Sequence, residues 1–132
     1  MQITRQADYA LRAILFLAKL EPNERASTSR IAEAQHIPSS FLAKIISQLS
    51  IAGLISTVRG ARGGVSLAKP SNKISMLDVV EAIDGPILLN DCTDPSYGCI
   101  FGDDCPIHPI WCQTKLDLVK KLKAATFDQL IK

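Results

Sequence analysis

Apolar residues return every three or four positions along the first part of the chain, which is the spacing of one face of an α-helix. Thr4 can cap such a helix over residues 5–20, and the Glu-Pro-Asn turn that follows ends it. A second, shorter helix begins near Ser27 or Thr28 and ends at the His-Ile-Pro turn at 36–38. The pattern therefore predicts two helices in close succession.

A third helix follows this turn directly. Ser39 or Ser40 caps it, Gly53 is placed to end it, and its polar face carries small side chains and Lys44. Two helices joined by a short turn, the second with a short-chained polar face, are typical of a helix-turn-helix whose second helix lies in the major groove of DNA. The apolar stripe that we expect to be buried consists of Phe41, Leu42, Ile45, Ile46 and Leu49.

Two short strands come next. Residues 54–58 and 65–67 read as a β-hairpin, and the Arg-Gly-Ala-Arg-Gly-Gly segment between them is flexible and basic. Directly after a recognition-type helix, such a hairpin is a wing. Arg59 or Arg62 on its glycine-rich tip can enter the narrow, negatively charged minor groove, where a bulkier tip would clash. The alternative is a plain hairpin whose glycines adopt positive backbone angles.

The second half of the chain combines helices with an irregular loop. Ser75 opens a fourth helix, whereas residues 90–108 show no periodicity. From Pro109 onward a helix with a broad apolar face is expected. Thr126 and Gln129 then predict a capping box before a short last helix.

The apolar helix that begins at Pro109 needs a partner surface, because the small winged domain has a core of its own. The same helix of a second subunit would supply that surface, so we expect a homodimer. Two-fold symmetry would place two recognition helices about one DNA turn apart, or a small multiple of it, which predicts a palindromic operator on double-stranded DNA. The predicted fold is mainly α with a small β-hairpin wing: a winged helix-turn-helix DNA-binding domain at 1–70, and a cysteine-containing loop with dimerisation helices at 71–132.

Charge is distributed unevenly along the chain. Residues 1–70 hold nine Lys or Arg against four Asp or Glu, while residues 71–132 hold six against nine. A basic first half favours binding to a polyanion such as DNA, because neutralising the phosphates releases condensed counterions and so contributes to affinity. No stretch is apolar enough to span a bilayer, and the N-terminus lacks the layout of a secretory signal. We therefore expect a soluble cytoplasmic protein with no membrane partner.

Cysteines gather in and beside the irregular loop. Cys92, Cys99 and Cys105 are separated by six and then five residues, and His108 follows after two more. A loop lets several thiolates converge on one inorganic core, which suits either zinc or an iron-sulfur cluster. In a reducing compartment such clustering favours metal or redox chemistry over disulfides. Cys112 falls on the apolar face of the next helix and is expected to be a buried structural cysteine.

Several segments resemble, in the correct order, one group of bacterial regulators. They are TRQADYALR at 4–12, the 37–54 helix, VRGARGG at 58–64, LDVVEAIDG at 77–85 and the cysteines that end in Cys-Pro-Ile-His at 105–108. Over nearly its whole length the chain is similar to the iron-sulfur winged-helix regulators of the IscR, NsrR and RirA type. The resemblance implies a homodimeric repressor or activator. Its cluster, which senses iron, oxygen, nitric oxide or another redox signal, would set its affinity for DNA.

The resemblance also assigns roles to single residues. It makes Cys92, Cys99 and Cys105 the ligands of a 2Fe-2S or 4Fe-4S cluster. The fourth ligand it implies is His108, as in IscR-like proteins, or Asp8 of the partner subunit, as in NsrR-like proteins, and we favour His108. The DNA contacts implied are Ser40, Lys44, Arg59 and Arg62, to which we add the neighbouring Ser39.

These patterns predict a transcriptional regulator and not an enzyme, since no nucleophile with a convincing base, phosphate-binding loop or paired acids is present. In the expected mechanism, a bound cluster orders the loop at 92–108 and so sets the separation of the recognition helices. Two other interpretations remain open. One is a regulator whose cysteines bind structural zinc or act directly as thiol switches. The other is an adaptor that binds a metabolic enzyme.

Overall fold

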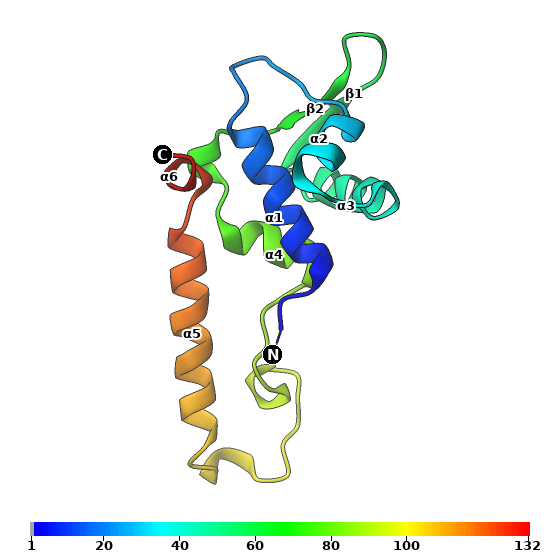
Figure 1. Ribbon diagram of the computed structural model, residues 1–132. Helices are drawn as coiled ribbons and strands as arrows, with labels where there is room; N and C mark the ends of the chain where they lie inside the picture. Colours follow the sequence, from blue (N-terminus) through cyan, green and yellow to red (C-terminus); the bar gives the residue numbers. More distant parts are fainter. Residues whose placement is uncertain (1) are drawn as a thin grey trace.

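Helices and a β-hairpin surround a hydrophobic core in the computed structural model, which describes residues 2–132 apart from the side chain of Asp103. The body consists of α1 (Arg5–Ala18), α2 (Thr28–Gln35), α3 (Ser39–Ile51), the antiparallel strands β1 (Ile55–Val58) and β2 (Gly64–Leu67), and α4 (Met76–Asp84). The remaining elements are the 3-10 turns η1 (Ser71–Lys73), η2 (Asp91–Thr93) and η3 (Gly102–Asp104), the long helix α5 (His108–Ala124) and α6 (Phe127–Leu130). α5 extends from the body to an irregular loop, which lies at the opposite end of the molecule from the hairpin (Figure 1).

Side chains cap three of the helices where the sequence predicts it. Thr4 Oγ1 accepts a hydrogen bond from the backbone N–H of Ala7 at 3.1 Å, and Ser27 caps α2 in the same way. At α4, Ser75 and Asp78 form a reciprocal capping box. Local hydrogen bonding of this kind decides where each helix begins.

Two predicted side-chain capping interactions do not form. The N-cap of α3 is Pro38, which offers no side-chain acceptor, and Ser39 is already the first helical residue. At α6, Thr126 is the N-cap but makes no capping bond, because its hydroxyl donates to the Asp128 carboxylate instead. Both helices are therefore held by tertiary packing instead of by side-chain caps.

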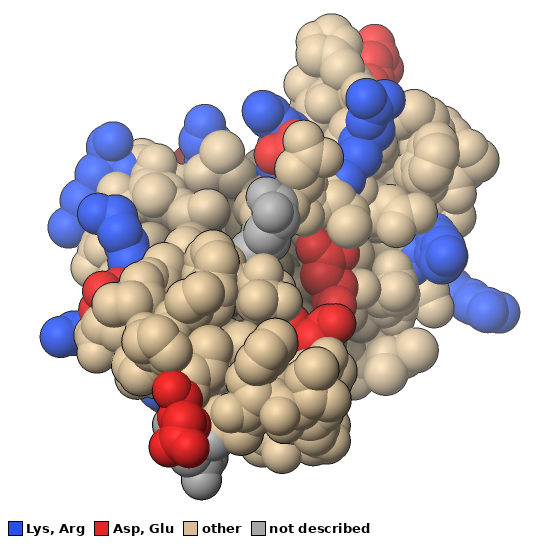
Figure 2. Space-filling model, turned by 90° about the horizontal axis from the view of Figure 1, so that it is seen from below, with Lys and Arg blue, Asp and Glu red and all other residues tan. Residues whose placement is uncertain are grey.

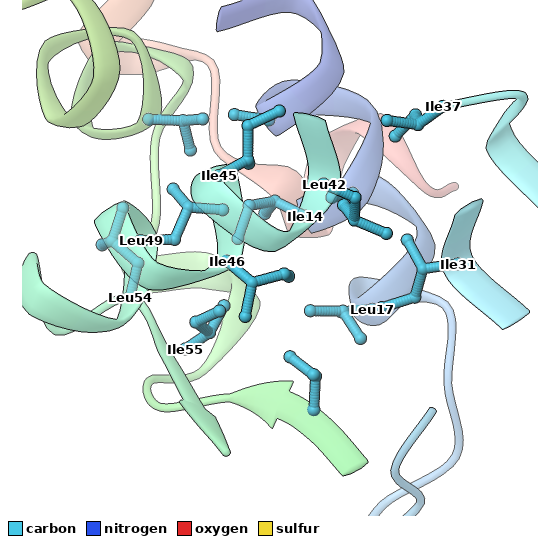
Figure 3. Packing of buried hydrophobic residues seen from close by; sticks show 14 of the residues in the cluster. Ile14, Leu17, Ile31, Ile37, Leu42, Ile45, Ile46, Leu49, Leu54 and Ile55 are labelled. Atoms are coloured by element: carbon cyan, nitrogen blue, oxygen red, sulfur yellow. The ribbon is translucent and has the colours of Figure 1, made fainter. Parts of the chain in front are cut away.

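The core lies where α1, α2 and α3 meet the hairpin. Ile14, Leu17 and Ile31 face the buried stripe of α3 (Figure 3). That stripe differs from the prediction at one end, because Phe41 is 42% exposed. Its ring lies beside the ring of Tyr9, with the two ring centroids 6.1 Å apart. The residues of α3 that are buried are Leu42, Ile45, Ile46 and Leu49, which recur at i, i+3, i+4 and i+7.

The second half of the chain contributes to the same core. Ile74, Val79 and Phe127 are buried in the cluster formed by α1, α2 and α3. Backbone hydrogen bonds fasten α6 to the segment before α4, from Phe127 N–H to the Ile74 carbonyl and from Met76 N–H to the Ala125 carbonyl. The domain boundary at residue 70 stays a prediction, and the core packs across it.

Glycines shape the tip of the hairpin. A Cβ at Gly63 would lie 2.0 Å from the carbonyl oxygen of Val58, and one at Gly64, where φ is +140°, would lie 2.9 Å from that of Ala26. A bridge between Ala26 and Val65 fastens the hairpin to the segment before α2. The turn is thus compact because it has no side chains at these positions.

α5 packs on the body through its C-terminal half. Leu118, Val119 and Leu122 contact the buried Leu77 and Val80 of α4. Toward the start of α5 large apolar side chains are exposed instead, namely Ile107, Ile110, Trp111 and Leu116. None of the helices that the structure describes is long and apolar enough to cross a membrane.

Candidate functional site

The irregular loop and the first turns of α5 border an open hollow of about 760 Å³. Cys92, Cys99, Cys105 and His108 all line it. The four residues of one chain that the sequence predicts as ligands thus border the same hollow, and their role as ligands stays a prediction. Aromatic and aliphatic side chains complete the lining, among them Tyr97, Phe101, Ile107 and Trp111.

Hydrogen bonds hold the first cysteine in place. The side chain of Asn90 accepts from the backbone N–H of Asp91 at 2.8 Å, and Thr93 Oγ1 donates back to the Asn90 carbonyl at 2.7 Å. Lys115 Nζ on α5 donates to the Thr93 carbonyl at 3.3 Å. Because Cys92 lies between these residues, the turn η2 sets its position relative to α5.

The thiols share one electrostatic neighbourhood. Partial burial raises the pKa of Cys92 above its ordinary value, and the nearby thiols of Cys112, Cys99 and Cys105 raise it further. Ionisation of Cys92 is therefore disfavoured. A bound cation would favour it, since thiolate is the form that binds metal.

Cys112 is not the buried structural cysteine that its helical position predicts. It is half-buried, and in α5 none of the residues is fully buried. Its Sγ lies 3.3 Å from Nε2 of His108, one helical turn earlier. The element that contacts α5 in this region is the short turn η2, so the thiol meets the histidine and the loop instead of a hydrophobic core.

Asp8 lies away from this hollow within one chain. It is on the exposed surface of α1, where its carboxylate pairs with Arg12 at 3.0 Å. It does not line the cavity that holds the cysteines. Its proposed role as a ligand from the partner subunit stays a prediction.

Thiols and an imidazole are donors of the kind that an iron-sulfur cluster takes. Within residues 2–132, no group of three His, Cys, Asp or Glu side chains is placed to hold one metal ion. A cluster is larger and accepts sulfurs that are farther apart around a roomy, partly apolar cavity. Three thiols and an imidazole on one such cavity fit a cluster by chemistry and by space.

The predicted DNA-contacting residues lie on α3 and the hairpin, at the side of the molecule away from α5 (Figure 1). Ser39, Ser40 and Lys44 are exposed on α3, and Arg59 and Arg62 are exposed at the hairpin tip. The ion pairs found in the described part of the chain, Arg12 with Asp8 and Arg30 with Glu24, involve none of these cations.

Charge separates the two ends of the molecule. Seen from the loop end, the nearest surface is largely uncharged with patches of carboxylate, and Lys and Arg lie toward the margins (Figure 2). The exposed cations of α3 and the hairpin tip lie at the far end of the body from this loop. These cations are exposed to solvent, as binding of a polyanion requires.

A family model described as an iron-dependent transcriptional regulator, Rrf2, matches residues 3–132. The chain belongs to the Rrf2 family. Regulators of this family bind DNA and typically act as dimers. The predicted family and its winged-helix fold are confirmed, and the chain is a transcriptional regulator of the Rrf2 type.

Solved structures of other Rrf2 proteins superpose on nearly the whole chain. CymR, the global cysteine regulator of B. subtilis, is 25% identical with a TM-score of 0.83, over 99% of this chain and 96% of that one. The oxidized form of Staphylococcus aureus CymR is 26% identical with a TM-score of 0.80, over 100% and 97%. IscR of T. potens is 23% identical with a TM-score of 0.80, over 99% and 86%, which supports the fold alone.

Proposed function

We propose that this Rrf2 regulator controls its affinity for a palindromic operator through an iron-sulfur cluster. Cys92, Cys99 and Cys105 would hold the cluster, with His108 as the fourth ligand. The observation that carries the proposal is that these four side chains line one hollow, although they are spread over 17 residues of irregular chain. The description of the family as iron-dependent agrees with it.

The reading surface would be α3 together with the hairpin tip. Ser39 and Ser40 are small and exposed at the start of α3, which lets the backbone approach base edges, and Lys44 lies one turn further along. Arg59 and Arg62 would enter the minor groove at the flank. A second copy of the chain, covering the exposed apolar start of α5, would place a second reading surface on the other half of the operator.

Coupling between the two sites would follow a chain of packed elements. When bound, the cluster supplies a cross-link among three points of the loop and the start of α5. α5 contacts α4 through Leu118 and Leu122, and α4 in turn packs on α1 and α3. Ordering the loop would thus fix the angle of α5 and, through α4, the placement of α3. A coupling free energy of about 1 to 3 kcal/mol changes DNA affinity by about 5- to 150-fold.

A second candidate is a regulator in which the thiols themselves are the switch. Two CymR proteins are similar to this chain over almost their whole lengths, and one of them is described in an oxidized form. All four cysteines here are free thiols. Two of them could form a disulfide by giving two electrons and two protons to a small disulfide oxidant, which becomes two thiols.

Anaerobic purification separates the two candidates. The wild-type protein should be coloured, with iron and sulfide in similar amounts, and the Cys92→Ser/Cys99→Ser/Cys105→Ser variant should be colourless. Gln113→Ser, on the exposed surface of α5, is the matched control and should keep the colour. A colourless wild-type protein without iron and sulfide would favour the thiol switch, and stoichiometric zinc would favour a structural zinc site.

A further inference from the structure

We propose that Cys112 is a further ligand of the metal centre, able to take the fourth coordination position in place of His108. The inference rests on the proposed function and extends it to a residue outside the three loop cysteines. It would give the regulator a second way of holding its cluster, by four thiolates instead of three thiolates and an imidazole.

Helix geometry places the two side chains at one location. His108 and Cys112 are four residues apart on α5 and therefore lie on the same face of the helix. Side chains of a helix point back toward its N-terminus, so the Cys112 thiol covers the turn that carries His108. The observed separation of 3.3 Å between Sγ and Nε2 agrees with this arrangement. A metal centre bound to the His108 imidazole would therefore lie close enough for the Cys112 thiol to bind it after a small rotation of the side chain.

The surroundings of Cys112 also favour a ligand over a packing residue. Cys112 is half-buried, and no residue of α5 is fully buried, so no hydrophobic core encloses the thiol. The neighbouring His108 and Trp111 line the hollow that the three loop cysteines border. The contact between the Cys112 thiol and the His108 imidazole therefore lies at the edge of that hollow.

Exchange of the fourth ligand would change the electronic properties of the centre. A thiolate carries one negative charge more than a neutral imidazole, and ligation by histidine in place of cysteine raises the reduction potential of a cluster. The form held by Cys112 should therefore have the lower potential and be harder to reduce. This difference gives the proposal a spectroscopic and electrochemical signature that does not depend on DNA binding.

The test uses the full chain, reconstituted anaerobically, in four forms: wild type, His108→Ala, Cys112→Ser and His108→Ala/Cys112→Ser. We expect His108→Ala to retain iron and sulfide near the wild-type level, with a lower reduction potential and altered electron paramagnetic resonance of the reduced cluster. Cys112→Ser should retain a cluster of wild-type potential through His108. The double variant should lose most of its iron and sulfide. His108→Ala/Gln113→Ser is the matched control and should behave like His108→Ala.

Three outcomes would contradict the proposal. If His108→Ala loses its cluster as completely as the double variant, or if the double variant keeps as much as His108→Ala, Cys112 is not a ligand. If His108→Ala keeps a cluster of unchanged potential, another residue has taken the position. A wild-type protein without iron and sulfide would instead overturn the proposed function itself. Far-ultraviolet circular dichroism of each metal-free form shows whether a variant has failed to fold, and Cys112→Ala then replaces the serine variant.

Discussion

Lys115 and Thr93 join two segments that are 22 residues apart, since the Lys115 ammonium on α5 donates to the Thr93 backbone carbonyl at 3.3 Å. Thr93 is buried and directly follows Cys92. The bond therefore fastens the cysteine loop to the helix that would transmit its state. In the proposed mechanism, this bond would pass a change of order in the loop on to α5.

Replacing Lys115 by methionine should loosen the loop without removing a ligand. We expect the Lys115→Met variant to assemble a cluster but to lose it faster than wild type, with cluster stability lowered by about 10-fold, as for supporting residues around other metal sites. The decrease of the cluster's visible absorbance under air measures the rate at which the cluster is lost. Lys120 is exposed on α5, and the Lys120→Met variant should lose its cluster at the wild-type rate. Equal rates for Lys115→Met and wild type would show that the bond to Thr93 does not support the site.

Removing the wing arginines should change how DNA binding responds to salt. For each of Arg59→Ala and Arg62→Ala, we expect weaker binding and a slope of log affinity against log salt that is less steep by roughly 0.9, the value for one phosphate contact. Fluorescence anisotropy with a labelled operator over a range of salt concentrations measures both. Lys120→Ala is the matched control, because Lys120 lies on α5 away from the hairpin. An unchanged slope in both arginine variants would mean that the hairpin tip does not contact DNA.

A methyl group at Gly63 should deform the hairpin. Its Cβ would lie 2.0 Å from the Val58 carbonyl oxygen, so the backbone must shift, and we expect Gly63→Ala to lower the free energy of unfolding by about 1 to 3 kcal/mol. It should also weaken DNA binding. Gly98 has open space around its Cβ position, so Gly98→Ala should stay within about 0.5 kcal/mol of wild type. Urea unfolding at one protein concentration compares them, and equal stability of the two variants would contradict the hairpin geometry.

The two ends of the α3 stripe should differ in their contribution to stability. Leu49 is fully buried, and Leu49→Ala should lower the free energy of unfolding by about 2 to 5 kcal/mol. Phe41 is 42% exposed, so Phe41→Ala should lower it by only about 1 kcal/mol, in spite of the larger side chain. Urea unfolding of the metal-free protein measures both. A larger loss of unfolding free energy for Phe41→Ala than for Leu49→Ala would mean that a partner covers Phe41 in solution.

Local chemistry explains why most of the fold could be predicted from sequence. The caps at Thr4, Ser27 and Ser75 and the glycines of the hairpin act on their own neighbours, so short patterns reveal them. Phe41 depends on its tertiary surroundings instead, whereas the Thr126 hydroxyl donates to the neighbouring Asp128 carboxylate. Helical periodicity places Phe41 beside the stripe but cannot tell how wide the covered surface is.

The candidate site shows the same division. The three loop cysteines and His108 are predicted by spacing and by resemblance, and they do line one hollow. The position of Cys112 on the apolar face of its helix predicts that the residue is part of a hydrophobic core. That face is covered by α4 only in its C-terminal half, around Leu118 and Leu122. Periodicity reports which face is apolar and cannot report where along the helix a neighbour ends.

The central claim is that the metal centre sets the affinity for DNA. Operators are first selected from random duplexes with the holo and the metal-free protein separately, and each form is then titrated anaerobically against both sets at one salt concentration. We predict affinities that differ by about 5- to 150-fold between the two forms on the same operator, with the difference abolished in Cys92→Ser/Cys99→Ser/Cys105→Ser. Equal affinities of the holo and metal-free forms on every selected operator would contradict the account.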